Sequence, residues 1–213
     1  MTPVVTVVDY GLGNLFSVAR ALESQGAQVR FAAEPDAIRA ADRLLLPGVG
    51  AFGDGMAGLA SRGLVEPIRE FARTGRPLFG ICLGTQLLMD EGREFGTHVG
   101  LGLVPGFVGA FDEQQGGRAE KIPHVGWNAI RPHNGTLWPG TFLADTPPGT
   151  PMYFTHSYVI RPAHDEDVVA VADYAGTEVC AVIRHENVSG CQFHPEKSGP
   201  AGLAILGRAL GCS

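Results

Sequence analysis

Short apolar runs alternate with helix-forming segments through the first ninety residues, and this alternation limits the fold more than any other feature. Each apolar run ends at a glycine, a proline or a polar residue and predicts a strand. The predicted strands cover residues 4–8, 28–33, 43–46 and 77–81. The predicted helices cover residues 15–25, 36–41, 56–72 and 84–89. Asn14 is expected to cap the first of them. Such an alternation is typical of a parallel sheet with helices on both faces.

The pattern changes after residue 104, where strand-like pieces follow one another without a long helix between them. These pieces lie at residues 107–111, 125–130, 152–155, 168–174 and 179–184. We expect an α/β fold with a mostly parallel open sheet and an antiparallel extension in its C-terminal half. A polar, glycine-rich loop is predicted over 112–120 and a last helix over 200–210. No linker divides the chain, so a single domain spanning residues 1–213 is expected.

Charge and apolar content limit the partners of this chain. Lys and Arg number 16 against 22 Asp and Glu, and the net charge of -6 disfavours binding to the phosphate backbone of nucleic acids. The hydrophobic fraction of 45% excludes a disordered chain, and no apolar run approaches the roughly 20 residues of a membrane span. The N-terminus enters a strand-like run without a secretory signal, so we expect a cytoplasmic protein whose four cysteines are reduced.

The strongest chemical signal is the segment Gly80-Ile81-Cys82-Leu83-Gly84, which lies between a predicted strand and a predicted helix. It matches the nucleophile elbow G-x-S-x-G with sulfur in place of oxygen. The flanking glycines permit a tight turn, which presents the Cys82 thiol at the carboxyl end of the sheet, where a helix N-terminus supports a thiolate. An isolated cysteine would more often be a buried core residue, but this context favours a nucleophile.

A thiolate that attacks a carbonyl group needs a base, and His194 is the best placed of the seven histidines. Phe193-His194-Pro195-Glu196 ends an apolar segment and places a carboxylate two residues after the imidazole. Side chains two residues apart in an extended chain share a face, so we expect Glu196 to orient His194 as the third member of a triad. A surface turn is the alternative interpretation of this tetrapeptide, and the elbow makes it the weaker one.

Backbone N–H groups that could stabilise an oxyanion are expected at two places. The first is Leu83, which directly follows the nucleophile. The second is Pro47-Gly48-Val49-Gly50, where Val49 and Gly50 follow a strand that should lie beside the elbow in a parallel sheet. A plain turn, in which the glycines only adopt positive φ angles, explains this second segment equally well.

Gly11-Leu12-Gly13, after the first predicted strand, resembles the start of a dinucleotide-binding fingerprint. Glu34 lies about where the ribose-binding acid of that fingerprint would be. Phe16, however, stands where the third glycine must allow close packing of helix and strand. We therefore expect no nucleotide cofactor.

Two cysteines and two histidines near the C-terminus could suggest a zinc site: Cys180, His185, Cys191 and His194. If both segments are strands, Cys180 and His185 point to opposite faces, and the same holds for Cys191 and His194. No metal is therefore expected.

These residues resemble the class I, triad-type glutamine amidotransferases. The catalytic blocks of that family are matched by Gly80-Ile81-Cys82-Leu83-Gly84-Thr85-Gln86 and Phe193-His194-Pro195-Glu196. Four further blocks resemble the branch of the family that forms the glutaminase subunits of imidazole glycerol phosphate synthase. They are Asp9-Tyr10-Gly11-Leu12-Gly13-Asn14, Pro47-Gly48-Val49-Gly50-Ala51-Phe52-Gly53-Asp54-Gly55-Met56, Pro123-His124-Val125-Gly126-Trp127-Asn128 and Tyr153-Phe154-Thr155-His156-Ser157-Tyr158. The resemblance extends from the first predicted strand to Ser198.

The resemblance implies a glutaminase that passes ammonia to a (β/α)8-barrel cyclase subunit in a heterodimer without a cofactor. That cyclase forms imidazole glycerol phosphate and aminoimidazole carboxamide ribotide in histidine biosynthesis. By the same match, Cys82 is the nucleophile, His194 the acid and base, and Glu196 its orienting partner. The residues implied in glutamine binding are Gly50, Gln86, Ser157 and Tyr158. Those implied at the cyclase interface are Trp127, Tyr153 and Lys197.

Two other functions stay open at this point. Another amidotransferase subunit, such as that of pyridoxal phosphate synthase or anthranilate synthase, would use the same chemistry. A silent interaction protein or thiol redox sensor, in which Cys82 is oxidised, is a different class, and the complete set of Cys82, His194 and Glu196 argues against it. Val49 stands where related amidotransferases usually have glycine. Because a β-branched residue resists a positive φ, we expect the peptide between Val49 and Gly50 to rest with its carbonyl, not its N–H, facing Cys82. The oxyanion hole would then lack a donor, and the free chain should be a poor glutaminase until the cyclase binds.

Overall fold

The computed structural model describes residues 2–111, 122–135, 138, 140–174 and 176–212. The strands of its large sheet are β1 (Val4–Val8), β2 (Gln28–Ala32), β3 (Leu44–Leu46), β4 (Leu78–Ile81), β8 (His124–Pro132), β9 (Pro151–His156), β11 (Val168–Tyr174), β12 (Thr177–His185) and β13 (Val188–Cys191). Within the described residues their order is β2-β1-β3-β4-β13-β12-β11-β8-β9. Neighbours run parallel from β2 to β13 and antiparallel from β13 to β9. The predicted fold class, including its antiparallel extension, is confirmed.

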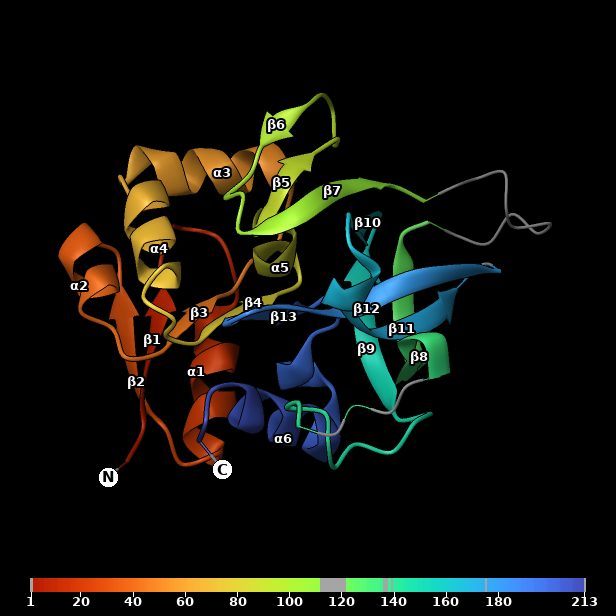
Figure 1. The fold of residues 1–213 in the computed structure, drawn as a ribbon. Coiled ribbons are helices and arrows are strands. Elements are labelled where there is room, and N and C mark those ends of the chain that lie inside the picture. The colour runs from red at the N-terminus through yellow and green to blue at the C-terminus, as the bar shows by residue number, and fades with distance from the viewer. Residues whose placement is uncertain (1, 112–121, 136–137, 139, 175, 213) are drawn as a thin grey trace.

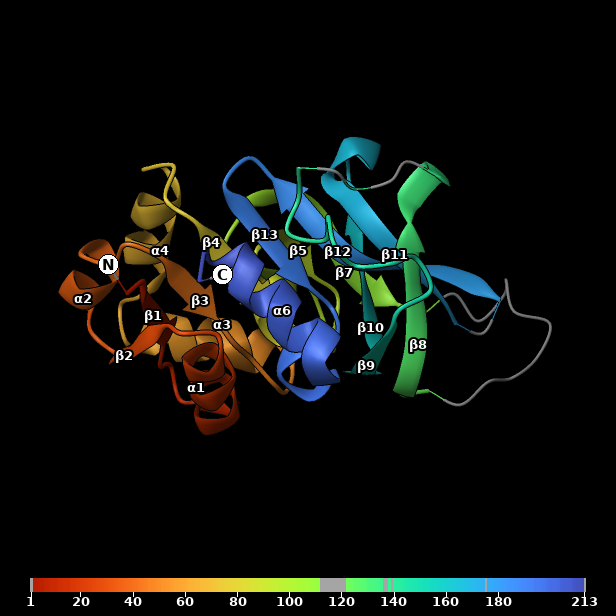
Figure 2. The same cartoon turned by 90° about the horizontal axis from the view of Figure 1, so that it is seen from below.

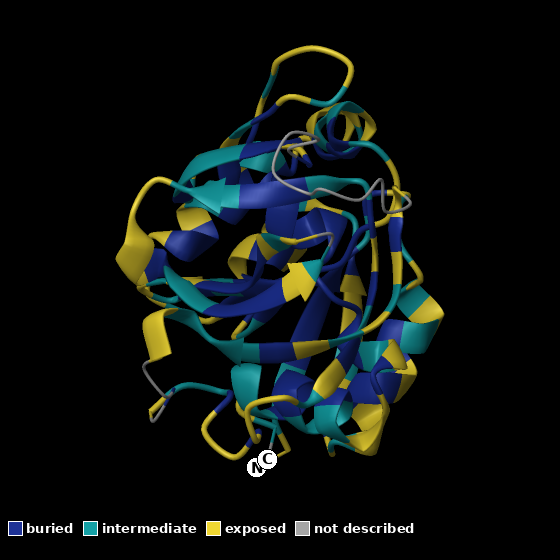
Figure 3. Ribbon diagram, turned by 90° about the vertical axis from the view of Figure 1, so that its right-hand side faces the viewer, coloured by how far each residue is buried: buried dark blue, intermediate teal, exposed yellow. Residues whose placement is uncertain are grey.

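Helices cover both faces of the parallel half of this sheet (Figure 1 and Figure 2). One face carries α1 (Leu15–Ser24) and α6 (Gly199–Ala209), and the other carries α2 (Pro35–Arg39), α3 (Phe52–Ser61), α4 (Val65–Ala72) and α5 (Leu83–Leu87). Strand residues alternate between the two layers: Leu45 packs on the α1 side, whereas Leu44 and Leu46 pack on the α4 side. Buried residues therefore concentrate in the central strands (Figure 3).

A second, smaller sheet lies at the carboxyl end of α5. Its strands are β5 (Met89–Gly92), β6 (His98–Val99), β7 (Val104–Ala110) and β10 (Tyr158–Pro162), in the order β10-β7-β5-β6 within the described residues. The predicted helix over 84–89 is thus too long, because α5 ends at Leu87 and the chain then enters β5. Pairing of β5 with β7 in the second sheet decides this conformation.

The predicted helix over 56–72 is also wrong, since the structure divides it into α3 and α4. Gly63 adopts a φ of 65°, its N–H donates to the Ala60 carbonyl, and the Leu64 N–H donates to the Leu59 carbonyl. This pair of hydrogen bonds is a Schellman motif, which ends a helix at a glycine in the left-handed region. Leu64 is fully buried, so the turn is also held by packing.

Two other expectations concern single segments. Asn14 caps α1 as predicted, because its side-chain oxygen accepts the Ser17 N–H at 3.2 Å. The loop predicted over 112–120 lies outside the described residues. Among the helices of the described part of the chain, none is long and apolar enough to span a bilayer.

Candidate active site

Cys82 lies in a tight turn between β4 and α5. It has φ 52° and ψ -113°, a strained conformation for a non-glycine residue, and it is 6% exposed. Glycine is required on both sides, because a Cβ on Gly80 would lie 2.7 Å from the Thr85 backbone and one on Gly84 would overlap the Leu46 carbonyl. Strand, turn and helix thus pack backbone against backbone, which is the geometry predicted for a nucleophile elbow.

His194 is brought to the elbow by β13, the parallel neighbour of β4. Ile81 pairs with Cys191, and the Cys82 N–H donates to the Cys191 carbonyl at 2.8 Å. The chain then continues to His194, whose Nδ1 lies 2.8 Å from Glu196 Oε1 and whose ring lines the same cavity as Cys82. Cys82, His194 and Glu196 are therefore assembled as the sequence predicts. The contact to Glu196 forms within a 3-10 turn over Pro195–Lys197, not in the extended chain that was expected.

The surroundings of His194 favour its protonated form. Burial lowers the pKa of His194, but hydrogen bonds to Cys82 and Glu196, together with the charges of both groups, outweigh burial and raise it to about 10. The Glu196 side chain is only 1% exposed, and among the described residues its Oε2 has no hydrogen-bond partner. Protonated His194, paired with the desolvated side chain of Glu196, is thus stable at neutral pH.

This raised pKa predicts a pH-dependent effect of Glu196→Gln on stability. A histidine whose pKa is raised on folding stabilises the protein fully below its unfolded value of 6.5, and this contribution is lost as pH rises to about 10. We expect Glu196→Gln to lower the free energy of unfolding most at pH 6 and least at pH 10, measured by urea titration. Glu70→Gln, which removes an exposed partner of Arg39, is the control whose effect should not vary over this range. An equal deficit for Glu196→Gln at every pH would contradict the assignment.

A cavity of about 260 Å³ opens in front of Cys82. It is lined by all the residues predicted to bind substrate or oxyanion: Val49, Gly50, Leu83, Gln86, Ser157 and Tyr158. Its remaining lining residues are Cys82, Glu94, Pro123, Thr155, His156 and His194. The structure therefore brings every predicted substrate residue to one site beside the nucleophile.

The segment between β3 and α3 forms one wall of this cavity. Gly50 has a φ of 109°, a conformation that favours glycine, whereas Val49 is not among the described residues with positive φ. Just after this segment, the Phe52 N–H donates to Glu94 Oε2 at 2.8 Å. Glu94 thus anchors the start of α3 and the wall that precedes it.

Glu94 was not predicted from the sequence, although it contributes a carboxylate to the cavity. It lies between β5 and β6, where no sequence motif marks it. Only the pairing of β5 in the second sheet turns this segment toward Cys82.

Comparison with known proteins agrees with this geometry. A sequence profile of glutamine amidotransferase class-I matches residues 6–210. The chain belongs to this family. This amidotransferase is 46% identical over 208 residues to an imidazole glycerol phosphate synthase subunit HisH 1 of Legionella pneumophila (strain Lens), covering 97% of this chain and 98% of that one. It is 45% identical over 205 residues to a subunit HisH of Rhodopirellula baltica, covering 96% and 95% of the two chains.

Solved structures resemble this amidotransferase over almost its whole length. PurLQS from Thermotoga maritima matches with a TM-score of 0.73 and 21% identity, covering 99% of this chain and 98% of that chain. The glutaminase domain of Trypanosoma brucei CTPS matches with a TM-score of 0.63 and 18% identity, covering 98% and 94%. At these identities the likeness concerns the fold alone.

Next to the active site, this amidotransferase presents an exposed aromatic and apolar surface. Trp127 is 55% exposed, and its ring packs edge-on against Tyr153 with centroids 5.9 Å apart. Lys197 Nζ lies 6.0 Å from the centre of the Tyr153 ring. The three residues predicted at a partner interface therefore form one group, beside the exposed side chain of Val125. Exposed groups of this kind are typical of protein interaction sites.

The residues that were considered as zinc ligands make other contacts in the structure. His185 Nδ1 lies 2.8 Å from Asp167 Oδ1. Burial raises the pKa of Cys180 to about 12, and it raises the pKa of Cys191 as well, so both thiols stay protonated. Among the described residues, no group of three or more His, Cys, Asp or Glu side chains converges as metal ligands would.

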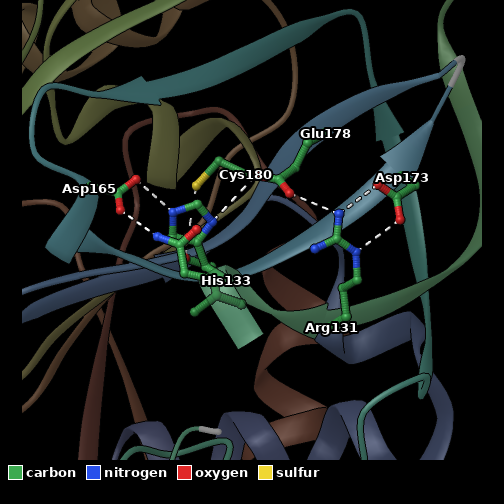
Figure 4. Close-up of polar contacts among 8 residues, drawn as sticks. Arg131, His133, Asp165, Asp173, Glu178 and Cys180 are labelled. Carbon is green, nitrogen blue, oxygen red and sulfur yellow. Dashed lines mark hydrogen bonds and ion pairs between the residues drawn. The ribbon is translucent and has the colours of Figure 1, made fainter. Parts of the chain in front are cut away.

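A second ionisable cluster of the amidotransferase joins strands of the antiparallel half (Figure 4). His133 lies between two carboxylates, with Nε2 2.7 Å from Asp165 Oδ1 and Nδ1 3.3 Å from Glu178 Oε1. Arg131 forms two hydrogen bonds to Asp173 and one to Glu178. Because most of these partners are exposed, the pairs link β8, β11 and β12 but add little to stability.

Proposed function

We propose that this chain is the glutaminase subunit of imidazole glycerol phosphate synthase. It hydrolyses glutamine and delivers the ammonia to a cyclase subunit that forms imidazole glycerol phosphate and aminoimidazole carboxamide ribotide. The observation that carries the proposal is the position of Cys82 beside the hydrogen-bonded pair of His194 and Glu196, in a chain that HisH subunits of that synthase match over 96–97% of its length. A redox sensor would need Cys82 but not this set.

In the first half of the reaction, the Cys82 thiolate attacks the side-chain amide carbon of glutamine. The carbonyl oxygen becomes an oxyanion, which the backbone N–H groups of Leu83 and Gly50 stabilise. Protonated His194 then donates its proton to the amide nitrogen, the carbon–nitrogen bond breaks, and ammonia leaves. A γ-glutamyl thioester on Cys82 remains.

In the second half, neutral His194 takes a proton from water, which attacks the thioester carbon. The carbon–sulfur bond breaks, glutamate leaves, and the thiolate–imidazolium pair is restored. Glu196 holds the ring of His194 through Nδ1 in both halves, so its other nitrogen always faces the reacting atoms. The sum is glutamine and water giving glutamate and ammonia.

Substrate is held in the cavity beside Cys82 by the residues predicted for that role: Gly50, Gln86, Ser157 and Tyr158. Glutamine also carries a positive α-amino group, which needs an acceptor. Glu94 supplies a carboxylate in the cavity, and its Oε2 is engaged with Phe52 while the charge remains available to the amino group. This assigns Glu94 a role in selecting an amino acid over a simple amide.

The partner is a (β/α)8-barrel cyclase that covers Trp127, Tyr153 and Lys197 in a heterodimer. Ammonia is protonated in neutral water and becomes a poor nucleophile, so an enclosed route from the cavity to a second active site is physically sensible. The chain acts as one domain over residues 1–213. We place it in the cytoplasm, where its four cysteines stay free thiols.

The test is glutamate release by the free chain, by its complex with the cyclase, and by that complex with the cyclase ligand bound. We expect the loaded complex to be the fastest and the free chain to be slow, because Val49 resists the peptide orientation that completes the oxyanion hole. Val49→Gly should raise the rate of the free chain. Failure of the cyclase to bind or to receive ammonia, together with stable binding to the acceptor subunit of anthranilate synthase, would contradict the proposal.

A further inference from the structure

Gln192 is a fully buried amide that lies against the nucleophile. It follows β13, two residues before His194, and its Nε2 lies 3.7 Å from Cys82 Sγ. Its Oε1 accepts a hydrogen bond from Gln86 Nε2 at 3.0 Å. A polar side chain without solvent access is therefore placed between the sulfur of Cys82 and a second amide.

Neighbouring groups determine which end of the Gln192 amide faces the sulfur. The Tyr158 carbonyl can only accept hydrogen bonds, and it lies 3.3 Å from Gln86 Nε2, so Gln86 must present its NH2 group there. The same NH2 group donates to Gln192, which must therefore present its oxygen to Gln86. The NH2 group of Gln192 is left to face Cys82. The Tyr158 carbonyl is itself held, because it also accepts from His156 Nδ1 at 2.8 Å.

Groups next to the sulfur of Cys82 thus favour opposite protonation states of this side chain. The Thr155 carbonyl lies 3.7 Å from Sγ and accepts the thiol hydrogen, which favours the neutral thiol. The Gln192 NH2 group can only donate, which favours the thiolate. The positive charge of protonated His194, which lines the same cavity, also favours the thiolate. Removing the donor at Gln192 should therefore shift Cys82 toward the thiol.

We propose that Gln192 stabilises the Cys82 thiolate by donating a hydrogen bond to its sulfur, and that Gln86 is a positioning residue that keeps the Gln192 amide in this orientation. The inference rests on the proposed function only in taking Cys82 as the nucleophile. It adds a donor to the reacting sulfur and gives Gln86 a role besides substrate binding. Because Gln86 acts through Gln192, the two residues should not act additively.

The test is the pH dependence of Cys82 alkylation by iodoacetamide, followed on the Cys82 peptide by mass spectrometry so that the other three cysteines do not interfere. Gln192→Met keeps the volume and removes the donor, and it should move the midpoint of the rate profile about one pH unit higher. At a fixed pH below the midpoint, this is about a tenfold slower reaction. Gln86→Met should move the midpoint less, and the double variant no further than Gln192→Met alone.

Thr85→Val is the matched control, because it removes another buried hydrogen bond of the same region, from Thr85 Oγ1 to the Cys191 carbonyl. It should leave the midpoint unchanged. If Gln192→Met does not fold, Gln192→Glu keeps the acceptor for Gln86, turns the donor into an acceptor and should raise the midpoint further. An unchanged midpoint in folded Gln192→Met or Gln192→Glu, or an equal shift in Thr85→Val, would overturn the inference.

Alkylation needs neither glutamine nor the cyclase, so the two proposals fail separately. If the midpoint moves as expected while the loaded complex releases no glutamate, the proposed function is wrong and the role of Gln192 stands. If the wild-type complex is an active glutaminase and the midpoint does not move, only the role of Gln192 is wrong.

Discussion

Cys82→Ala should abolish product formation from glutamine in the complex with the cyclase while leaving product formation from added ammonium salts intact. The Cys82 thiolate is the group that forms the acyl intermediate in the proposed mechanism, and loss of a catalytic nucleophile typically lowers turnover by about 10⁴-fold or more. The cyclase site does not use this thiol. The measurement is the rate of imidazole glycerol phosphate formation with each nitrogen source.

Two further variants test the roles of His194 and Glu196 in the same assay. His194→Asn should lower the glutamine-dependent rate by a similar factor, and Glu196→Gln by less, because orientation of the ring is only part of the function of the base. Cys180→Ala is the matched control, since it removes a buried thiol away from the cavity and should preserve both activities. Loss of the ammonium-dependent rate in a well-folded Cys82→Ala complex would contradict the assignment of glutamine hydrolysis to this chain and of the ammonia-using reaction to the cyclase.

Gly84→Ala is expected to destabilise the protein by about 3 kcal/mol or more and to remove glutaminase activity. A Cβ at this position would overlap the Leu46 carbonyl, which is backbone at the end of β3 and cannot rotate away as a side chain can. Relief requires α5 to move from the sheet, and Cys82 and Leu83 at its start would move with it. Urea unfolding of the purified chain measures the loss of stability.

Gly207→Ala provides the control for this substitution. Gly207 is a buried glycine inside α6, and an added Cβ would lie 3.1 Å from Gln25 Oε1 and 3.2 Å from its Cβ and Cγ, contacts that a shift of a few tenths of an ångström relieves. Alanine also favours the helix, so the free energy of unfolding should change by no more than about 1 kcal/mol. Equal effects of the two substitutions would show that close packing of the elbow against β3 is not what requires glycine at 84.

The errors in the predicted elements have separate physical causes. The end of α3 at Ser61 was readable in principle, because Gly63 followed by the apolar Leu64 is a helix C-terminal signal. The strands β5 and β6 were not readable, because pairing within the second sheet, of β5 with β7 and of β6 with β5, makes strands of segments that carry no strand pattern of their own. Glu94 was missed for the same reason, because it lies between those two strands.

The sequence by itself determined the alternation of strands and helices, the elbow at Cys82, and the residues that accompany it, because strand runs, caps and glycine turns depend on near neighbours. Only the tertiary structure decided which of these groups touch. The pairing of β13 with β4 brings His194 and Gln192 to Cys82, and the second sheet brings Glu94. Burial and hydrogen bonding then set the protonation of His194, because these depend on side chains from distant segments meeting away from water.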